Sequence, residues 1–239
     1  MGSAQFHIIA MGGGGFLMEP ENAALDQYVL SQARRRNPAV CFVPTAGGDS
    51  DSAIGRFYAA FTKLRCRPTH RQLFDRTPDL RTFFAAQDVI YVGGGNTKSM
   101  LAVWREWQIP ELLRRAWRAG TVLAGVSAGA ICWFDRGITD SWAGRLRPLP
   151  CLGFLPGTCC PHYDGEAERR PAVHRLVSRQ TVGNVLALDD GAAAHFIGRK
   201  LARIVTSRPT AGAYRVQRTG RQTVEIPLAV RRLPRRPTD

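Results

Sequence analysis

A chain of 239 residues can bury a sizeable hydrophobic core within one domain, without help from disulfides or metal ions. Hydrophobic residues make up 44% of the chain and charged residues 22%, a composition typical of soluble globular proteins, and no apolar run is long enough to cross a bilayer. The net charge is +14, yet only three of the 33 basic residues are lysine and most are dispersed, which disfavours a nucleic-acid partner.

Short apolar runs alternate with amphipathic stretches through the first half of the chain. We expect strands at residues 6–11, 39–43, 69–74, 88–92 and 121–124, and helices at residues 23–36, 53–64, 79–86, 98–104 and 109–119. This alternation predicts an α/β fold with a mainly parallel sheet that is covered on both faces.

The pattern loosens after Phe134, where Pro148, Pro150 and Pro156 indicate a long region of loops and short elements. Beyond it we expect a helix at residues 167–178 and strands at residues 185–188, 193–197, 213–216 and 223–227, the last two forming a hairpin. We interpret Asp189-Asp190-Gly191 as a turn between two of these strands. Residues 1–230 are expected to form a single domain, and the basic residues 231–239 a disordered tail.

The start of the chain and its cysteines bear on location and metal binding. Residues 1–5 lack the charged start and long apolar core of a signal peptide, so we expect a cytoplasmic protein with no membrane partner. Cys151, Cys159 and Cys160 lie near His162 in the sequence, but their spacing matches no usual zinc pattern. We therefore expect reduced, mostly buried thiols, no metal site and no cofactor.

The segment Gly125-Val126-Ser127-Ala128-Gly129 follows an expected buried strand and has the G-x-S-x-G form of a nucleophile elbow. In this motif a strand turns sharply into a helix, and the two glycines let neighbouring backbone crowd the turn. The serine is left on a strained corner with its hydroxyl exposed. Because the strand at residues 121–124 and a helix start at residues 130–134 supply the required context, we predict Ser127 as a nucleophile.

Two glycine-rich loops follow other strands of the expected sheet, and sites gather at the carboxyl ends of parallel strands. The loop at residues 12–15 lacks the spacing and the ribose-binding acid of a dinucleotide motif. Gly93-Gly94-Gly95 suits an oxyanion hole, in which its N–H groups are joined by that of Ala128 after the nucleophile. The alternative is a tight strand-to-helix turn with no chemical role.

A serine nucleophile needs a base, and the sequence offers five histidines. Four of them lie in strands or helices, or far from the elbow, where packing or solvation explains them: His7, His70, His174 and His195. His162 lies in the irregular segment of residues 157–164, which suits a site residue. We therefore predict His162 as the general base.

A carboxylate must orient the base, and four acids are close in sequence: Asp135, Asp140, Asp164 and Glu166. The sequence alone does not choose among them, and each also suits a surface position or a helix cap. Asp140 lies between nucleophile and base, which gives the chain order Ser, Asp, His.

With these residues assembled, the chain resembles the peptidase E (aspartyl dipeptidase) and cyanophycinase family of serine peptidases. The resemblance covers most of residues 6–200 and rests on three segments in order: Val92-Gly93-Gly94-Gly95-Asn96-Thr97, Gly125-Val126-Ser127-Ala128-Gly129-Ala130 and Cys160-Pro161-His162-Tyr163. It implies a three-layer α/β sandwich with a mainly parallel central sheet. Such a fold is flavodoxin-like and related to class I glutamine amidotransferases, with serine where those enzymes carry cysteine.

The resemblance also implies a Ser–His–acid hydrolase that works through an acyl-enzyme. Ser127 would attack the substrate and His162 would carry the proton. Asp140 is the nearest match to the family's acid, and Glu166 and Asp164 remain alternatives. The residues that match the oxyanion region are Gly94, Gly95 and Ala128.

The substrate does not follow from the resemblance, because the family's aspartate-binding arginine falls on Glu168 in this chain, beside Arg169 and Arg170. An acid there repels an aspartyl side chain and suits an α-ammonium or a basic side chain, so strict Asp-X specificity is not expected. The residues assigned to substrate binding are Asn96, Thr97, Tyr163, Asp164, Glu168, Arg169 and Arg170.

We expect an intracellular serine peptidase that hydrolyses dipeptides or short peptides near a free N-terminus, with a short peptide as its partner. A cyanophycinase-like isopeptidase, or another amidase, is the alternative within the same class of enzyme. The non-enzymatic alternative is a protein that binds nucleic acid or another anion on the same scaffold. A homodimer is compatible with the sequence, which does not determine the oligomeric state.

Overall fold

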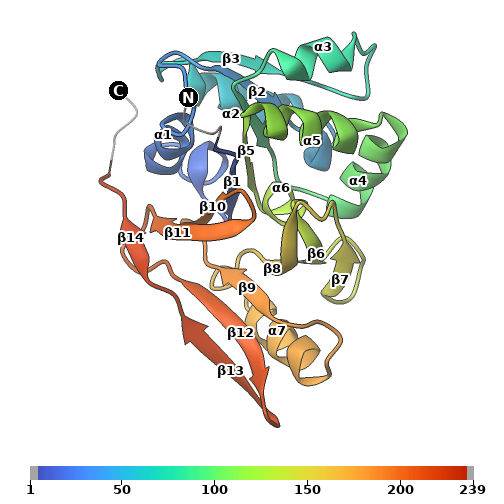
Figure 1. The fold of residues 1–239 in the computed structure, drawn as a ribbon, viewed down its shortest axis with the longest axis vertical. Coiled ribbons are helices and arrows are strands. Elements are labelled where there is room, and N and C mark those ends of the chain that lie inside the picture. Colours follow the sequence, from blue (N-terminus) through green and yellow to red (C-terminus); the bar gives the residue numbers. More distant parts are fainter. Residues whose placement is uncertain (1–4, 236–239) are drawn as a thin grey trace.

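The computed structural model describes residues 5–235, in which two β-sheets and their helices form a continuous body. The larger sheet lies among helices in the upper part of Figure 1, and the smaller sheet lies below it with one helix beside it. The helices are α1 (Ala24–Leu30), α2 (Asp51–Phe61), α3 (Leu80–Ala85), α4 (Thr97–Glu106), α5 (Ile109–Ala119), α6 (Ala128–Ile131) and α7 (Arg169–Ser178). No helix within residues 5–235 is long and apolar enough to cross a membrane.

The larger sheet has the strand order β14-β11-β10-β1-β5-β4-β2-β3. Its strands are β1 (His7–Met11), β2 (Ala39–Val43), β3 (Arg67–His70), β4 (Val89–Val92), β5 (Val122–Val126), β10 (Ala192–Ile197), β11 (Lys200–Thr206) and β14 (Val230–Arg232). β1, β5, β4, β2 and β3 run parallel, whereas β10 pairs antiparallel with both β1 and β11. The carboxyl ends of the parallel strands therefore meet at one edge, which is where ligand sites form in such sheets.

Both faces of the parallel strands are buried under helices. Successive side chains of a strand point to opposite faces, so neighbouring residues belong to different core clusters. Ile9 and Met11 of β1 belong to one core cluster, together with residues of α1 and α2. Ile8 and Ala10 belong to another, together with residues of α3, α4 and α5. The sheet is therefore the middle of three layers, and the expected α/β sandwich with a mainly parallel central sheet is confirmed.

The smaller sheet has the strand order β13-β12-β9-β8-β6-β7. Its strands are β6 (Phe134–Thr139), β7 (Arg147–Pro150), β8 (Leu155–Cys160), β9 (Val185–Leu188), β12 (Ala213–Thr219) and β13 (Gln222–Pro227). β12 and β13 form the expected hairpin. The cluster that packs against α3–α5 also includes Phe134 and Leu155 of this sheet, so one hydrophobic core extends from the larger sheet into the smaller one.

For residues 134–160 the sequence predicted loops and short elements without assigning any strand, and the structure has three short strands there, β6, β7 and β8. Pro148 and Pro150 obscured β7, since proline removes a backbone donor and rarely lies inside a sheet. β7 is the last strand of its sheet and pairs only with β6 among the described residues, so its second edge needs no donors. Its existence depends on that pairing and not on local preference.

The basic end of the chain is also more ordered than expected. Val230–Arg232 pairs in parallel with β11 as β14, and Leu233 is buried in the cluster that includes α1. The disordered tail predicted at residues 231–239 is therefore wrong for residues 231–233, whereas residues 236–239 lie outside the described part of the chain. A parallel neighbour supplies hydrogen bonds that the composition of this segment does not reveal.

Candidate active site

Ser127 lies between β5 and α6, at the carboxyl edge of the larger sheet. Its φ is 57°, a backbone conformation that residues with a side chain rarely adopt. A side chain at Gly125 would overlap the backbone of Gly129, and one at Gly129 would overlap the carbonyl of Val92 in β4. The two glycines therefore allow β5, α6 and β4 to approach closely, and the turn has the strained geometry of a nucleophile elbow.

Ser127 and His162 line the same cavity, whose volume is about 390 Å³. The loop after β4, with Gly93, Gly94 and Gly95, forms part of its wall, and most of the remaining wall is apolar. A Cβ atom on Gly94 would lie 3.2 Å from the Ser127 Cβ, so this loop passes directly beside the serine. The cavity is at the lower end of the range of small-ligand sites, which is roughly 300–1,000 Å³.

Three backbone N–H groups near Ser127 are free to receive an anion. The N–H groups of Gly94, Gly95 and Ala128 have no hydrogen-bond acceptor within residues 5–235. Gly95 has a φ of 134°, and a side chain there would overlap the Ala46 carbonyl, so the course of this loop requires glycine. The partly exposed Ser127 hydroxyl makes no hydrogen bond within the same residues and is free to turn toward a substrate.

His162 follows β8 and is anchored beside the serine through the end of β1. Its N–H donates to the Gly12 carbonyl at 3.3 Å, and the N–H of Ser127 donates to the adjacent Met11 carbonyl at 3.0 Å. The His162 Nδ1 lies 2.6 Å from Oδ1 of Asp190. Only 12% of the His162 side chain and 11% of the Asp190 side chain are exposed, so solvent competes little for this hydrogen bond.

Asp190 therefore occupies the position that the sequence analysis assigns to Asp140. The Asp140 side chain is 66% exposed and, like Glu166, it lies against a buried arginine of α7 and not against His162. Asp164 accepts a hydrogen bond from the Asp190 N–H at 2.8 Å, so it supports Asp190 from behind. The prediction of Asp140 from chain order was wrong, since Asp140 contacts Arg169 and Asp190 contacts His162.

The position of Asp190 follows from the pairing of two strands. β8 and β9 are parallel neighbours, so the residues that follow them meet at one edge of the smaller sheet. His162 comes two residues after β8 and Asp190 two residues after β9. The sequence did hold this signal, an acid just beyond a buried strand, but turn chemistry alone accounts for Asp189-Asp190-Gly191 and concealed it.

The glycine tract after β1 makes room for the His162–Asp190 pair. A side chain at Gly13 would overlap the Asp190 carboxylate, and one at Gly12 would overlap the carbonyls of Leu188 and Asp189. The Gly13 carbonyl also accepts the Gly191 N–H at 3.0 Å. The tract therefore brings β1 against the end of β9, which explains its glycines without any dinucleotide.

Two opposed effects act on the charge of Asp190. Burial raises the pKa of its carboxyl, but the hydrogen bond and charge of His162, with Arg208 and Arg169 nearby, outweigh burial and lower the pKa below its usual value. The carboxylate is therefore ionised at neutral pH and accepts the His162 Nδ1–H. That hydrogen bond leaves Nε2 of the neutral ring without a proton and able to accept one.

Several residues assigned to substrate binding have partners within the protein. The Asn96 side chain caps α4, and Thr97 beside it is buried. The Tyr163 hydroxyl donates to one carboxylate oxygen of Glu225 in β13 at 2.6 Å, and Arg170 pairs with the other. None of these residues lines the Ser127 cavity, and the contacts of Tyr163 and Arg170 with Glu225 hold the segment after His162 against the smaller sheet.

Glu168 and Arg169, at the start of α7, also lie outside the Ser127 cavity. Arg169 is buried between Glu166 and Asp140. Glu168 lines a separate cavity of about 480 Å³, together with Asp140 and Trp142. An acid at Glu168 is therefore not placed to repel a substrate side chain in the cavity of the serine.

Metal chemistry has no obvious ligands in the part of the chain that the structure describes. Within residues 5–235, no group of three or more His, Cys, Asp or Glu side chains could hold a metal ion. The six cysteines are free; burial raises the pKa of Cys160 to about 12 and also holds the pKa of Cys159 well above its usual value. These thiols are protonated at neutral pH, which disfavours metal binding and nucleophilic reaction.

Residues 8–204 match peptidase family S51. The chain belongs to this family. It is 55% identical over 227 residues to a Bacillus subtilis (strain 168) protein named uncharacterized peptidase YgaJ, which covers 95% of this chain and 98% of the relative. It is 26% identical over 185 residues to peptidase E of Pasteurella multocida (strain Pm70), covering 70% of this chain and 74% of the relative.

Two solved structures share the fold of this S51 protein. A crystal structure of a peptidase from an acI-B1 actinobacterium superposes with a TM-score of 0.68 at 17% identity, covering 94% of this chain and 96% of that one. A putative peptidase E of Listeria monocytogenes EGD-e superposes with a TM-score of 0.62 at 17% identity, covering 87% of this chain and all of that one. The resemblance to peptidase E is thus confirmed in both sequence and fold.

Proposed function

We propose that this S51 protein is a serine peptidase that cleaves dipeptides and other short peptides near a free N-terminus. In the proposed triad, Ser127 is the nucleophile, His162 the general base and Asp190 the group that orients His162. The observation that carries the proposal is the 2.6 Å contact between His162 and Asp190 beside the cavity that Ser127 lines. Three separate strands, β5, β8 and β9, deliver the three residues to one place, which packing alone does not require.

The first half of the reaction forms an acyl-enzyme. The Ser127 Oγ attacks the carbonyl carbon of the scissile bond while His162 Nε2 takes the hydroxyl proton. The carbonyl oxygen becomes negatively charged, and the free N–H groups of Gly94, Gly95 and Ala128 are placed to donate to it. Asp190 stabilises the imidazolium that forms, because its carboxylate is ionised and already accepts the Nδ1–H.

The second half releases both products. The His162 imidazolium donates its Nε2 proton to the departing amine, so the peptide C–N bond breaks and the acyl group stays on Ser127. A water molecule then loses a proton to His162 and attacks the ester carbonyl, with the same N–H groups stabilising the oxyanion. Collapse of this intermediate returns the proton to Ser127 Oγ and frees the carboxylic acid product.

The size of the cavity favours short substrates. At about 390 Å³, the cavity holds a small number of residues and not a folded chain. Its wall comes from several loops, including those after β2 and β4. A short peptide fits a cavity of this size more readily than a folded protein does.

The proposal is tested by replacing the nucleophile. Purified wild type and Ser127→Ala are incubated with a library of di- to tetrapeptides, and the products are read by mass spectrometry. We expect Ser127→Ala to lose activity by about 10³-fold or more and to lose labelling by a fluorophosphonate probe. Ser178→Ala, at an exposed serine that ends α7, is the matched control and should retain both.

Circular dichroism shows whether each variant keeps the wild-type fold. Turnover retained by a folded Ser127→Ala variant would contradict the proposed mechanism. Labelling of wild type at a serine other than Ser127 would contradict it too.

A further inference from the structure

The cavity of Ser127 has a one-sided charge. Among its lining residues, Arg56 is the only Lys or Arg, His162 is the only other titratable side chain, and no carboxylate is present. Apolar side chains such as Phe42, Pro44 and Ala53 line the same cavity. A positive charge beside apolar walls attracts an anionic group more strongly than one in open water.

Arg56 lies on the side of α2 that lines the cavity. Ser50, Ala53 and Arg56 line the cavity at a spacing of three residues, whereas Ile54 and Phe57 of the same helix are buried in the core. Residues three apart share one face of a helix, and helical side chains lean toward the N-terminal end. Arg56 therefore lies on the same side of α2 as Ala53, as an exposed side chain in the wall of the cavity.

No group of the protein neutralises Arg56 within residues 5–235. The structure shows no ion pair and no side-chain hydrogen bond for it, although eight ion pairs form elsewhere in these residues. The two acids before it are not placed to pair with it. The Asp49 carboxylate accepts the Leu73 and Phe74 N–H groups, and Asp51 begins α2 without lining the cavity.

The arginines that follow His162 in the sequence are already occupied. Arg169 is buried against Glu166, and Arg170 pairs with Glu225 and lies over the ring of Tyr163. Neither lines the Ser127 cavity. Among the described residues that line that cavity, Arg56 is therefore the only permanently charged cation available to a substrate anion.

We propose that Arg56 binds a carboxylate of the peptide substrate and thereby determines which short peptides Ser127 cleaves. This inference rests on the proposed function, and it adds a substrate class: peptides with a carboxylate within reach of the scissile bond. That carboxylate is either the terminal α-carboxylate of a very short peptide or an aspartate or glutamate side chain. In both cases the planar guanidinium can donate two parallel hydrogen bonds to the two oxygens.

The test compares peptides that differ only in one carboxylate. Peptides that wild type cleaves are resynthesised as matched pairs in two arms. In the first arm, the two peptides differ in a free or an amidated C-terminus. In the second arm, they differ in one side chain, Asp against Asn or Glu against Gln. We measure kcat/KM for wild type, Arg56→Gln and Arg56→Lys. Arg65→Gln, at a basic residue remote from this cavity, controls for the loss of one positive charge.

We expect wild type to prefer the acid over its amide by about tenfold or more in one arm, and that arm identifies the source of the carboxylate. Arg56→Gln should abolish this preference mainly through KM, Arg56→Lys should keep part of it, and Arg65→Gln should keep it all. An unchanged acid-to-amide ratio in Arg56→Gln, or no preference in wild type, would overturn the inference. The proposed function is tested separately, by the loss of turnover in Ser127→Ala. An unchanged acid-to-amide ratio would therefore overturn this inference and leave the proposed function standing.

Discussion

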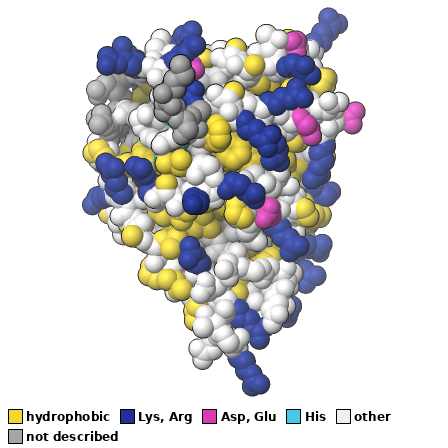
Figure 2. All heavy atoms as spheres, viewed as in Figure 1, with side chains coloured by type: hydrophobic (Ala, Val, Ile, Leu, Met, Phe, Trp, Pro, Cys, Tyr) yellow, Lys and Arg dark blue, Asp and Glu magenta, His cyan; other side chains and the backbone are white. Residues whose placement is uncertain are grey.

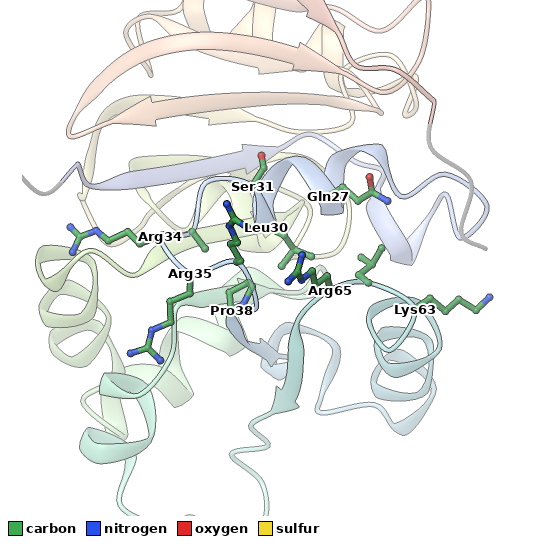
Figure 3. A pocket seen from close by; sticks show the side chains of 11 residues that line it. Gln27, Leu30, Ser31, Arg34, Arg35, Pro38, Lys63 and Arg65 are labelled. Carbon is green, nitrogen blue, oxygen red and sulfur yellow. The ribbon is translucent and has the colours of Figure 1, made fainter.

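The two edges of the larger sheet carry opposite polar groups. At the carboxyl edge, glycine-rich loops turn free N–H groups toward the cavity of Ser127. At the amino edge, the segments that follow α1 and α2 surround a groove of about 460 Å³, shown in Figure 3. The basic residues that line this groove are Arg34, Arg35, Arg36, Lys63 and Arg65.

Helix ends account for the cations at the amino edge. α1 and α2 run toward the groove and end there, because the residues just after each helix line it. A side chain at Gly120, which ends α5, would overlap the Arg34 guanidinium, so Arg34 lies against a third helix C-terminus. Unpaired carbonyls give a C-terminus a partial negative charge that nearby cations stabilise. The helix ends therefore offset part of the groove's positive charge.

The comparison shows that the number of charges is a poor guide to the site. Lys and Arg side chains are scattered over the whole face seen in Figure 2, in keeping with the net charge of +14. The strained backbone at Ser127 and the N–H groups without acceptors are found at the other edge. Strain and unsatisfied donors near a cavity point to the carboxyl edge as the candidate site, whereas helix ends offset part of the positive charge at the amino edge.

The largest effect is expected at the carboxyl edge, for Asp190→Asn. The amide keeps the shape of the side chain but removes the charge that fixes the His162 tautomer, so kcat should fall by about 10³- to 10⁴-fold. Asp140→Asn, at the acid that chain order favoured, should leave kcat unchanged. Steady-state kinetics on one good peptide measures both, and an equal loss in the two variants would contradict the assignment of Asp190.

A smaller effect is expected for the crowded turn at the same edge. Gly129→Ala places a side chain against the Val92 carbonyl and should lower the free energy of unfolding by about 3 kcal/mol. Gly55→Ala, on an exposed position of α2 with no atom within 4 Å of the new Cβ, is the matched control. It should raise that free energy by about 0.5–1 kcal/mol, since alanine favours a helix. Urea unfolding measures both, and equal midpoints would refute the crowding argument.

The smallest effect is expected at the amino edge, for Arg34→Gln. Loss of the cation at the C-terminus of α5 should reduce the free energy of unfolding by up to about 1 kcal/mol, and less at high salt. The kcat/KM should not change, because this groove is separate from the Ser127 cavity. A loss of activity without a loss of stability would show that the groove does more than balance helix carbonyls.

The sequence was most informative where a residue's role is set by its immediate neighbours. Ser127 was recognised from glycines at fixed spacing after an apolar strand, and the structure shows the positive φ that this spacing permits. Gly95 belongs to the same class, since its φ of 134° is a property of the loop itself. His162 was found by excluding histidines that lie in regular elements, which needs only local pattern.

The candidate acid, Asp190, and the arginine of the cavity wall, Arg56, could be identified only from the tertiary structure. Asp190 lies 28 residues after His162 and meets it only because β8 and β9 pair in parallel, a contact that no periodicity encodes. Arg56 comes from a helix in the first third of the chain and joins the cavity only when β2 and β4 lie side by side. The sequence by itself therefore determined the fold class and predicted Ser127 and His162 as candidate nucleophile and base, because these depend on local backbone preferences and on apolar patterning. Strand pairing decided which acid contacts His162 and which arginine lines the cavity of Ser127, because pairing joins residues whose separation along the chain carries no signal.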